Sequence, residues 1–150
     1  MGLVFQMKGR WMVLEAVQPV KTTPIEAWIQ RGVGGHVVAK RLRRAESLLT
    51  PAALERLRKS GRKFLGKPYD LTFEWDDRRI YCSELVWKVY KEGLGIEVGR
   101  LSRLRDFDLS HPAVRQKMHE RYGSRIPRDM PVISPGAIFD SPELMEVWNR

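Results

Sequence analysis

Cys82 is the single cysteine of this 150-residue chain, and cysteine is a side chain suited to nucleophilic attack near neutral pH. Leu85, Val86 and Val89 follow it at helical spacing, which predicts an amphipathic helix that starts at or next to Cys82. Unpaired backbone amides and the helix dipole favour a thiolate at such a helix end. The alternative is a small buried hydrophobic residue. One cysteine excludes an internal disulfide and a Cys-rich zinc site.

A cysteine nucleophile needs a base and a polar group that orients the base. The histidines are His36, His111 and His119, and none lies in a sequence setting typical of a catalytic base. His36, beside two glycines at the start of a predicted strand, is the best alternative among them. Glu15 interrupts the apolar run 11–17, which predicts either a partly buried acid that orients an imidazole or a polar strand face.

Local signals predict the elements that position these side chains. Apolar runs around a Lys-Gly-Arg turn predict a hairpin, and Thr-Pro pairs at 23–24 and 50–51 predict two helix starts. The expected strands are 2–7, 11–17 and 36–42, and the expected helices are 24–31, 51–65 and one from Cys82 to about 92, with three further helix starts at 110–112, 134–135 and 141–142. The pattern indicates an α+β fold, with a small antiparallel sheet packed with helices.

The net charge of +9 raises nucleic acid and anionic surfaces as partners, and much of the excess lies between Lys40 and Arg62. Because no aromatic residues are interleaved for base stacking, we favour a solvated helix face there and expect no nucleic-acid partner.

Two segments resemble ligand motifs only superficially. Residues 61–67 lack the Ser or Thr of a phosphate-binding loop, and four acidic residues between Asp70 and Asp77 lack the spacing of a calcium loop. We therefore expect a solvated acidic loop and no cofactor or metal. No window approaches 18 consecutive apolar residues, so no membrane-spanning helix is expected.

Two short motifs, with Glu15-Ala-Val upstream, carry a family resemblance. Gly-Lys-Pro-Tyr-Asp at 66–70 and Tyr-Cys-Ser-Glu-Leu-Val at 81–86 resemble the YiiX-like group of circularly permuted, NlpC-type papain-like cysteine hydrolases. The similarity extends over nearly the whole chain. It implies a papain-like core in which a helix start presents Cys82 against a sheet that carries the histidine, and amidase, peptidase or acyl hydrolase activity on cell-wall peptides, acylated amino acids or lipids.

The family's histidine is the feature that these 150 residues lack. It occurs in the family as Ser-His, a small apolar residue and Gly; Met1 and Gly2 match the last two positions, so the histidine would stand directly before Met1. We therefore expect residues 1–150 to be a single permuted papain-like domain, truncated at its N-terminus and impaired in activity. A domain that has lost its chemistry is the other interpretation.

The resemblance assigns roles to individual residues. Cys82 would be the nucleophile and Glu15 would orient the histidine, while the Cys82 amide could bind an oxyanion and Tyr69 or Tyr81 could supply another polar contact. A peptide, lipid or other small molecule is the expected substrate. The alternatives are an inactive binding domain of the same fold and a basic nucleic-acid-associated protein.

Location and association are further expectations. The resemblance implies the periplasm or cell envelope, with contact to an anionic surface. An uncovered strand at 3–6 predicts self-association through the N-terminal edge.

Overall fold

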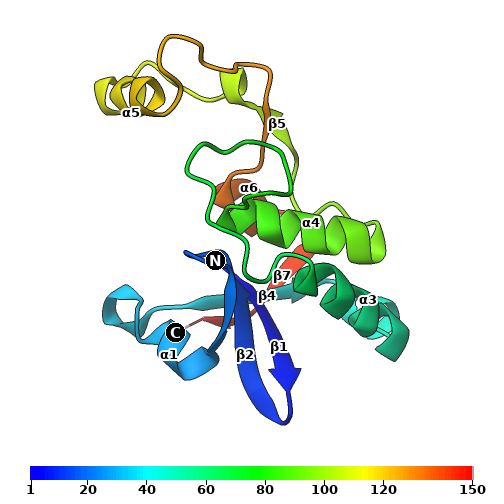
Figure 1. Cartoon of the computed structure of the whole chain (residues 1–150). Helices are drawn as coiled ribbons and strands as arrows, with labels where there is room; N and C mark the ends of the chain where they lie inside the picture. Colours follow the sequence, from blue (N-terminus) through cyan, green and yellow to red (C-terminus); the bar gives the residue numbers. More distant parts are fainter. Residues whose placement is uncertain (150) are drawn as a thin grey trace.

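The predicted hairpin is present in the computed structural model, which describes residues 1–149 (Figure 1). It consists of β1 (Leu3–Met7) and β2 (Arg10–Glu15), and both residues of its turn have positive φ. β3 (Lys21–Pro24) pairs antiparallel with the other side of β2. The order of this sheet is β1-β2-β3, so β1 lies at an edge.

The rest of the described chain alternates short helices with two small two-stranded sheets. The elements are α1 (Ile25–Ile29), η1 (Val33–Gly35), β4 (Val38–Leu42), α2 (Ala45–Leu48), α3 (Pro51–Arg62), α4 (Cys82–Leu94), β5 (Ser102–Arg103), η2 (Leu104–Asp106), α5 (Pro112–Tyr122), β6 (Pro131–Val132), α6 (Pro135–Phe139) and β7 (Leu144–Asn149). β4 pairs antiparallel with β7, and β5 with β6. None of the described helices is long and apolar enough to cross a membrane.

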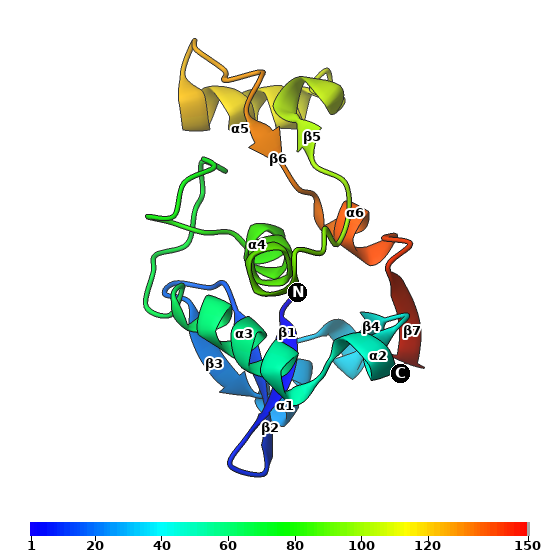
Figure 2. The same ribbon diagram turned by 90° about the vertical axis from the view of Figure 1, so that its right-hand side faces the viewer.

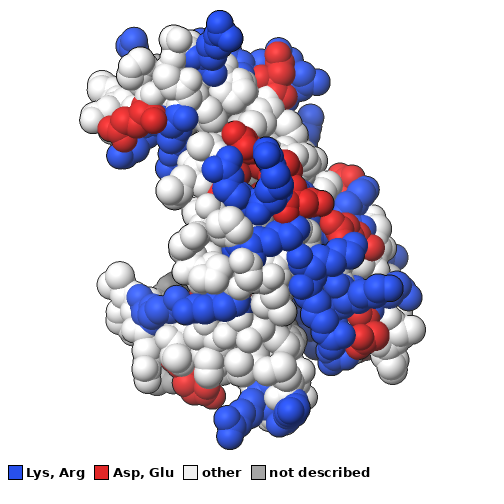
Figure 3. Space-filling model, viewed as in Figure 1, with Lys and Arg blue, Asp and Glu red and all other residues white. Residues whose placement is uncertain are grey.

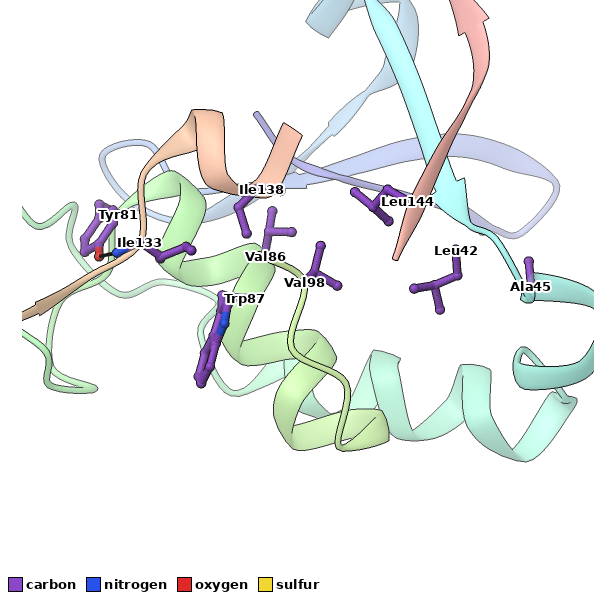
Figure 4. Close-up of a cluster of buried hydrophobic side chains, with 9 residues drawn as sticks. All are labelled: Leu42, Ala45, Tyr81, Val86, Trp87, Val98, Ile133, Ile138 and Leu144. Carbon is purple, nitrogen blue, oxygen red and sulfur yellow. Dashed lines mark hydrogen bonds between the residues drawn. The ribbon is translucent and has the colours of Figure 1, made fainter. Parts of the chain in front are cut away.

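Helix α4 is the central element, seen end-on in Figure 2 with the β1-β2-β3 sheet below it. α3 packs along α4, and Gly93 allows the close approach, because a Cβ there would lie 2.9 Å from the Leu57 side chain. One buried cluster joins α4 to α6, β4 and β7 (Figure 4). A second lies between α4 and the hairpin and includes Leu14, Phe64 and Leu85. Both clusters fix α4 relative to the sheets.

One predicted helix start is wrong, and another predicted helix begins one residue later than expected and without its predicted cap. Thr23 does not cap α1; it lies in β3, and its hydroxyl donates to Glu15. Ser141-Pro142 begins no helix, because the Ser141 hydroxyl accepts from the amide of Gly99 (3.0 Å) and the following residues extend into β7 against β4. In both places, the side-chain hydroxyl that was expected to cap a helix forms a hydrogen bond with another part of the chain instead.

The loop at 67–79 is also less solvated than predicted. Asp70 is completely buried, and its Oδ1 accepts from the amide and hydroxyl of Thr72 at 2.7 and 2.8 Å. The other acids of the loop are paired with Arg78, Arg79 or Lys88. These contacts hold the loop in place next to Ile80 and Tyr81, the two residues that precede α4.

Residues 101–133, hereafter the α5 segment, project away from the sheet and from α3 in both ribbon views (Figures 1 and 2). The segment leaves and returns through the paired strands β5 and β6, with Ser102 opposite Val132 and Arg103 opposite Pro131. Within α5 only Met118 is buried. The segment therefore stands on a two-stranded neck and has little core of its own.

The basic face predicted on α3 is present, and Lys and Arg side chains gather there (Figure 3). Several of them have partners: Arg58 and Arg62 pair with Glu55, and Lys63 pairs with Glu92 at 2.8 Å. Such exposed pairs fit the solvated face favoured from the sequence.

Candidate active site

Cys82 is the first residue of α4, as predicted, and its side chain is partly exposed. Tyr81 precedes it in extended conformation, and the Glu84 carboxylate accepts a hydrogen bond from the Tyr81 amide (N···Oε2 3.3 Å). This cap uses an amide before the helix and leaves the amide of Cys82 free of a helical partner. The geometry therefore presents a thiol together with a donor for a nearby oxyanion.

Tyr69 lies beside the thiol. An isolated parallel bridge joins Tyr69 to Ile80, two residues before Cys82, and the Asp70 amide donates to the carbonyl of Ile80 at 3.2 Å. Burial raises the pKa of Tyr69, and the neighbouring Cys82 thiol raises it further. The Tyr69 hydroxyl therefore stays protonated and can donate a hydrogen bond near the nucleophile.

Tyr81 has a different position from the one expected. Its hydroxyl accepts from the backbone amide of Ile133 (3.1 Å) in the core, as the dashed line in Figure 4 shows. Its ring packs edge-on against Phe73, with centroids 4.9 Å apart. Burial raises its pKa. These contacts hold the residue before Cys82 in place and leave Tyr69 as the tyrosine beside the thiol.

Glu15 ends β2 and is 3% exposed. The hydroxyl of Thr23 donates to its Oε1 (2.6 Å), and the guanidinium of Arg31 donates to its Oε2 (2.5 Å). Burial alone would raise the pKa of Glu15, but these two donors outweigh it and hold the pKa below its usual value. Glu15 is therefore a charged acid, as expected from the sequence, and is buried more deeply than predicted.

The first residues of the chain connect Glu15 with the nucleophile. A Cβ at Gly2 would lie 3.5 Å from the Cβ of Glu15. In both ribbon views the N-terminus lies next to the N-terminal end of α4, where Cys82 stands (Figures 1 and 2). Met1, Glu15 and His36 line one surface pocket of about 280 Å³, together with parts of α1 and the turn after it.

The three histidines are all exposed, and none of the described hydrogen bonds joins one of them to Cys82 or Glu15. His36 follows η1 at the pocket that Glu15 lines. His111 precedes α5 and His119 lies within it. His36 is thus the histidine that the structure brings to the candidate site.

Sequence reasoning missed the partners of the acid. Thr23 resembled a helix cap, and Arg31 is separated from Glu15 by 16 positions, so neither carried a local signal. The register of β2 against β3 would have revealed Thr23, because Val13 opposite Thr23 places it near the end of β2.

These features can be compared with known proteins. The sequence profile of a family described as permuted papain-like amidase enzyme, YaeF/YiiX, C92 family, matches residues 1–148. The chain belongs to this family. Among its relatives, the uncharacterized protein YiiX of Escherichia coli (strain K12) is 48% identical over 146 residues, which cover 97% of this chain and 71% of the relative.

A solved structure agrees with this assignment. The crystal structure of metalloprotein YiiX from Escherichia coli O157:H7 matches with a TM-score of 0.91 and 43% identity, over 99% of this chain and 81% of that one. The predicted family and the permuted papain-like α+β fold are therefore confirmed. At a coarse level, membership in an amidase family supports the hydrolase class.

The solved relative is described as a metalloprotein. Among residues 1–149 of the present chain, no three His, Cys, Asp or Glu side chains come together in a way that could hold a metal ion.

Proposed function

We propose that this member of the papain-like amidase family is a cysteine-dependent hydrolase that cleaves an amide or ester bond in a cell-wall peptide, an acylated amino acid or a lipid. The observation that carries the proposal is the placement of Cys82. It begins α4 with Tyr69 beside its thiol, and the chain's first residues lead from this helix end to the charged, buried Glu15.

The reaction follows from these groups. The Cys82 sulfur attacks the substrate carbonyl carbon, and the displaced electron pair collects on the carbonyl oxygen, where the Cys82 amide donates to it. An imidazole takes the thiol proton; as the carbonyl re-forms, the C–N or C–O bond breaks, and the imidazolium gives this proton to the leaving amine or alkoxide, which leaves a thioester on Cys82. Water, deprotonated by the same imidazole, then cleaves the acyl-sulfur bond and frees the thiol.

The imidazole in this proposal stands directly before Met1. Support comes from the family pattern and from the position of Met1, which lines the Glu15 pocket and lies near the start of α4. His36 is the alternative base, because it lines the same pocket.

The test compares two extended chains that differ in one residue. One carries Ser-His before Met1 and the other Ser-Ala, and both are assayed on thioester and amide substrates. We expect the Ser-His chain to be faster by roughly 10²- to 10⁴-fold, which is the usual contribution of a general base. Cys82→Ser should abolish this gain, and Glu15→Gln should reduce it.

Equal rates in the two extended chains would contradict the proposed position of the base. If the chain of 150 residues hydrolyses these substrates and His36→Ala abolishes the activity, His36 is the base. If no form shows Cys82-dependent turnover, the fold serves as an inactive binding domain.

A further inference from the structure

The C-terminal end of α5 is fastened to the loop that leads to Cys82. The Tyr122 hydroxyl donates to the backbone carbonyl of Thr72, and the Arg121 guanidinium lies 4.6 Å from the centre of the Phe73 ring. Although the α5 segment projects from the core, the guanidinium of Arg121 therefore lies against the loop that precedes Cys82.

A short series of contacts leads from Arg121 to the nucleophile. Phe73, beneath the guanidinium, packs on the ring of Tyr81, which directly precedes Cys82. Tyr69, in the same loop, lies beside the thiol. Burial and the Cys82 thiol raise the pKa of Tyr69, whereas the charge of Arg121 acts in the opposite direction. The field of Arg121 thus reaches the group that adjoins the thiol.

Arg121 is also uncommitted. Its side chain is partly buried, and within residues 1–149 it forms no ion pair, whereas neighbouring cations of the α5 segment pair with Asp129 or Glu120. The acid of the adjoining loop, Asp70, is completely buried and forms no ion pair with Arg121 among the described residues; its Oδ1 accepts from Thr72, and its Oδ2 is buried without a hydrogen-bond partner there. A guanidinium that stacks on an aromatic ring and pairs with no carboxylate of the protein is suited to bind an anionic group of a ligand.

We propose that Arg121 binds an anionic group of the substrate, a carboxylate or a phosphate, close to the bond that Cys82 attacks. The inference rests on the proposed function and adds a substrate class to it. Among the substrates considered, it selects acyl compounds that also carry an acid group. A neutral analogue would lose the contact with Arg121.

Alkylation of Cys82 tests this without turnover, since the chain has no other cysteine. Iodoacetate and iodoacetamide differ in one negative charge, so the ratio of their rates reports the potential at the thiol. We expect Arg121→Gln to lower this ratio by roughly three- to tenfold, as removal of one nearby charge in a partly solvated site should. Arg121→Lys should preserve most of it.

Arg115→Gln is the matched control, because Arg115 is an exposed arginine on the same helix and its loss changes the net charge equally. An equal fall in both variants, or none in Arg121→Gln, would overturn the proposal. A second measurement needs no variant: N-acetylglycine should protect Cys82 from iodoacetamide at lower concentration than N-acetylglycinamide. Equal protection by the two compounds would also overturn it.

Inorganic phosphate serves as a third protecting compound. Stronger protection by phosphate than by acetate assigns the subsite to phosphate esters, and the reverse assigns it to carboxylates. Because alkylation requires no general base, a chain that fails to hydrolyse any substrate can still show the Arg121 effect. Failure of the proposed function and failure of this inference are thereby distinguishable.

Discussion

Glu15 and Glu84 are both buried acids, and their surroundings move their pKa values in opposite directions. At Glu15, two donors outweigh burial, so the folded chain keeps a carboxylate. At Glu84, burial dominates and raises the pKa to about 7, although Lys88 lies 2.8 Å from its Oε1. Glu15 is held as a charge near the candidate site, whereas Glu84, in the first turn of α4, titrates near neutrality.

Glu84→Gln should change how stability depends on pH. Because Glu84 binds its proton more tightly in the folded chain, its stabilising contribution is full below pH 4.5, the ordinary pKa, and is lost as pH rises to about 7. The unfolding free energy of the natural chain, relative to Glu84→Gln, should therefore fall by up to about 3 kcal/mol across this window. Urea denaturation at a series of pH values measures it.

Glu55→Gln provides the control, since Glu55 is an exposed acid of α3 paired with arginines. It should follow the natural chain at every pH. Parallel curves for the natural chain and Glu84→Gln would show that Glu84 is not the titrating group.

At the scale of elements, local signals account for what the sequence could predict. The hairpin turn and the helix starts at Thr50 and Cys82 depend on a few adjacent residues, and all three are present. Thr23 and Ser141 carried the same kind of signal, but tertiary contacts gave their hydroxyls other partners, the Glu15 carboxylate and the Gly99 amide. Pairing between segments about 100 positions apart, such as β4 with β7, has no local signature.

The same limit applies to the site. Cys82 and Glu15 were identifiable because each contrasts with its own neighbours, a thiol at a helix start and an acid in an apolar strand. Arg31 and Arg121 were not identifiable, because their importance comes from the path of the chain after α1 and around the α5 neck.

The exposed edge of β1 leads to a prediction about association. Val4 lies on this edge strand and is 49% exposed. Unpaired edge strands form hydrogen bonds with other chains, and an inserted lysine opposes this. We expect the natural chain to self-associate as its concentration rises, and Val4→Lys to shift it toward monomer, as measured by sedimentation velocity.

Val33→Lys makes the same exchange at an exposed valine of η1, away from the edge. It should leave the association unchanged. An equal effect of both substitutions would point to net charge rather than to pairing of β1.

At the scale of the whole molecule, we expect the free energy of local opening to be lower in α5 than in α4. Most of α4 is buried, whereas α5 buries one side chain and meets the core through its last turn. Segments with few buried contacts open without global unfolding. We expect the α5 amides to exchange with deuterium much faster than those of α4, measured by mass spectrometry on peptides from each helix.

Tyr122→Phe removes the hydroxyl that reaches Thr72 and should accelerate exchange in α5 while α4 keeps its rate. If hydrogen exchange gives the same free energy of opening for the amides of α4 and α5, the two helices unfold together and the prediction is wrong.

The neck of the α5 segment has a consequence for how such a protein can change over generations. Since β5 and β6 pair side by side, everything between them enters and leaves the core at one place. Insertions, deletions or new charges in that stretch would alter what is held beside Cys82 without displacing α4 or the sheet that carries Glu15. The α5 segment can therefore diverge among descendants while the helix and the sheet that carry the candidate site are inherited intact.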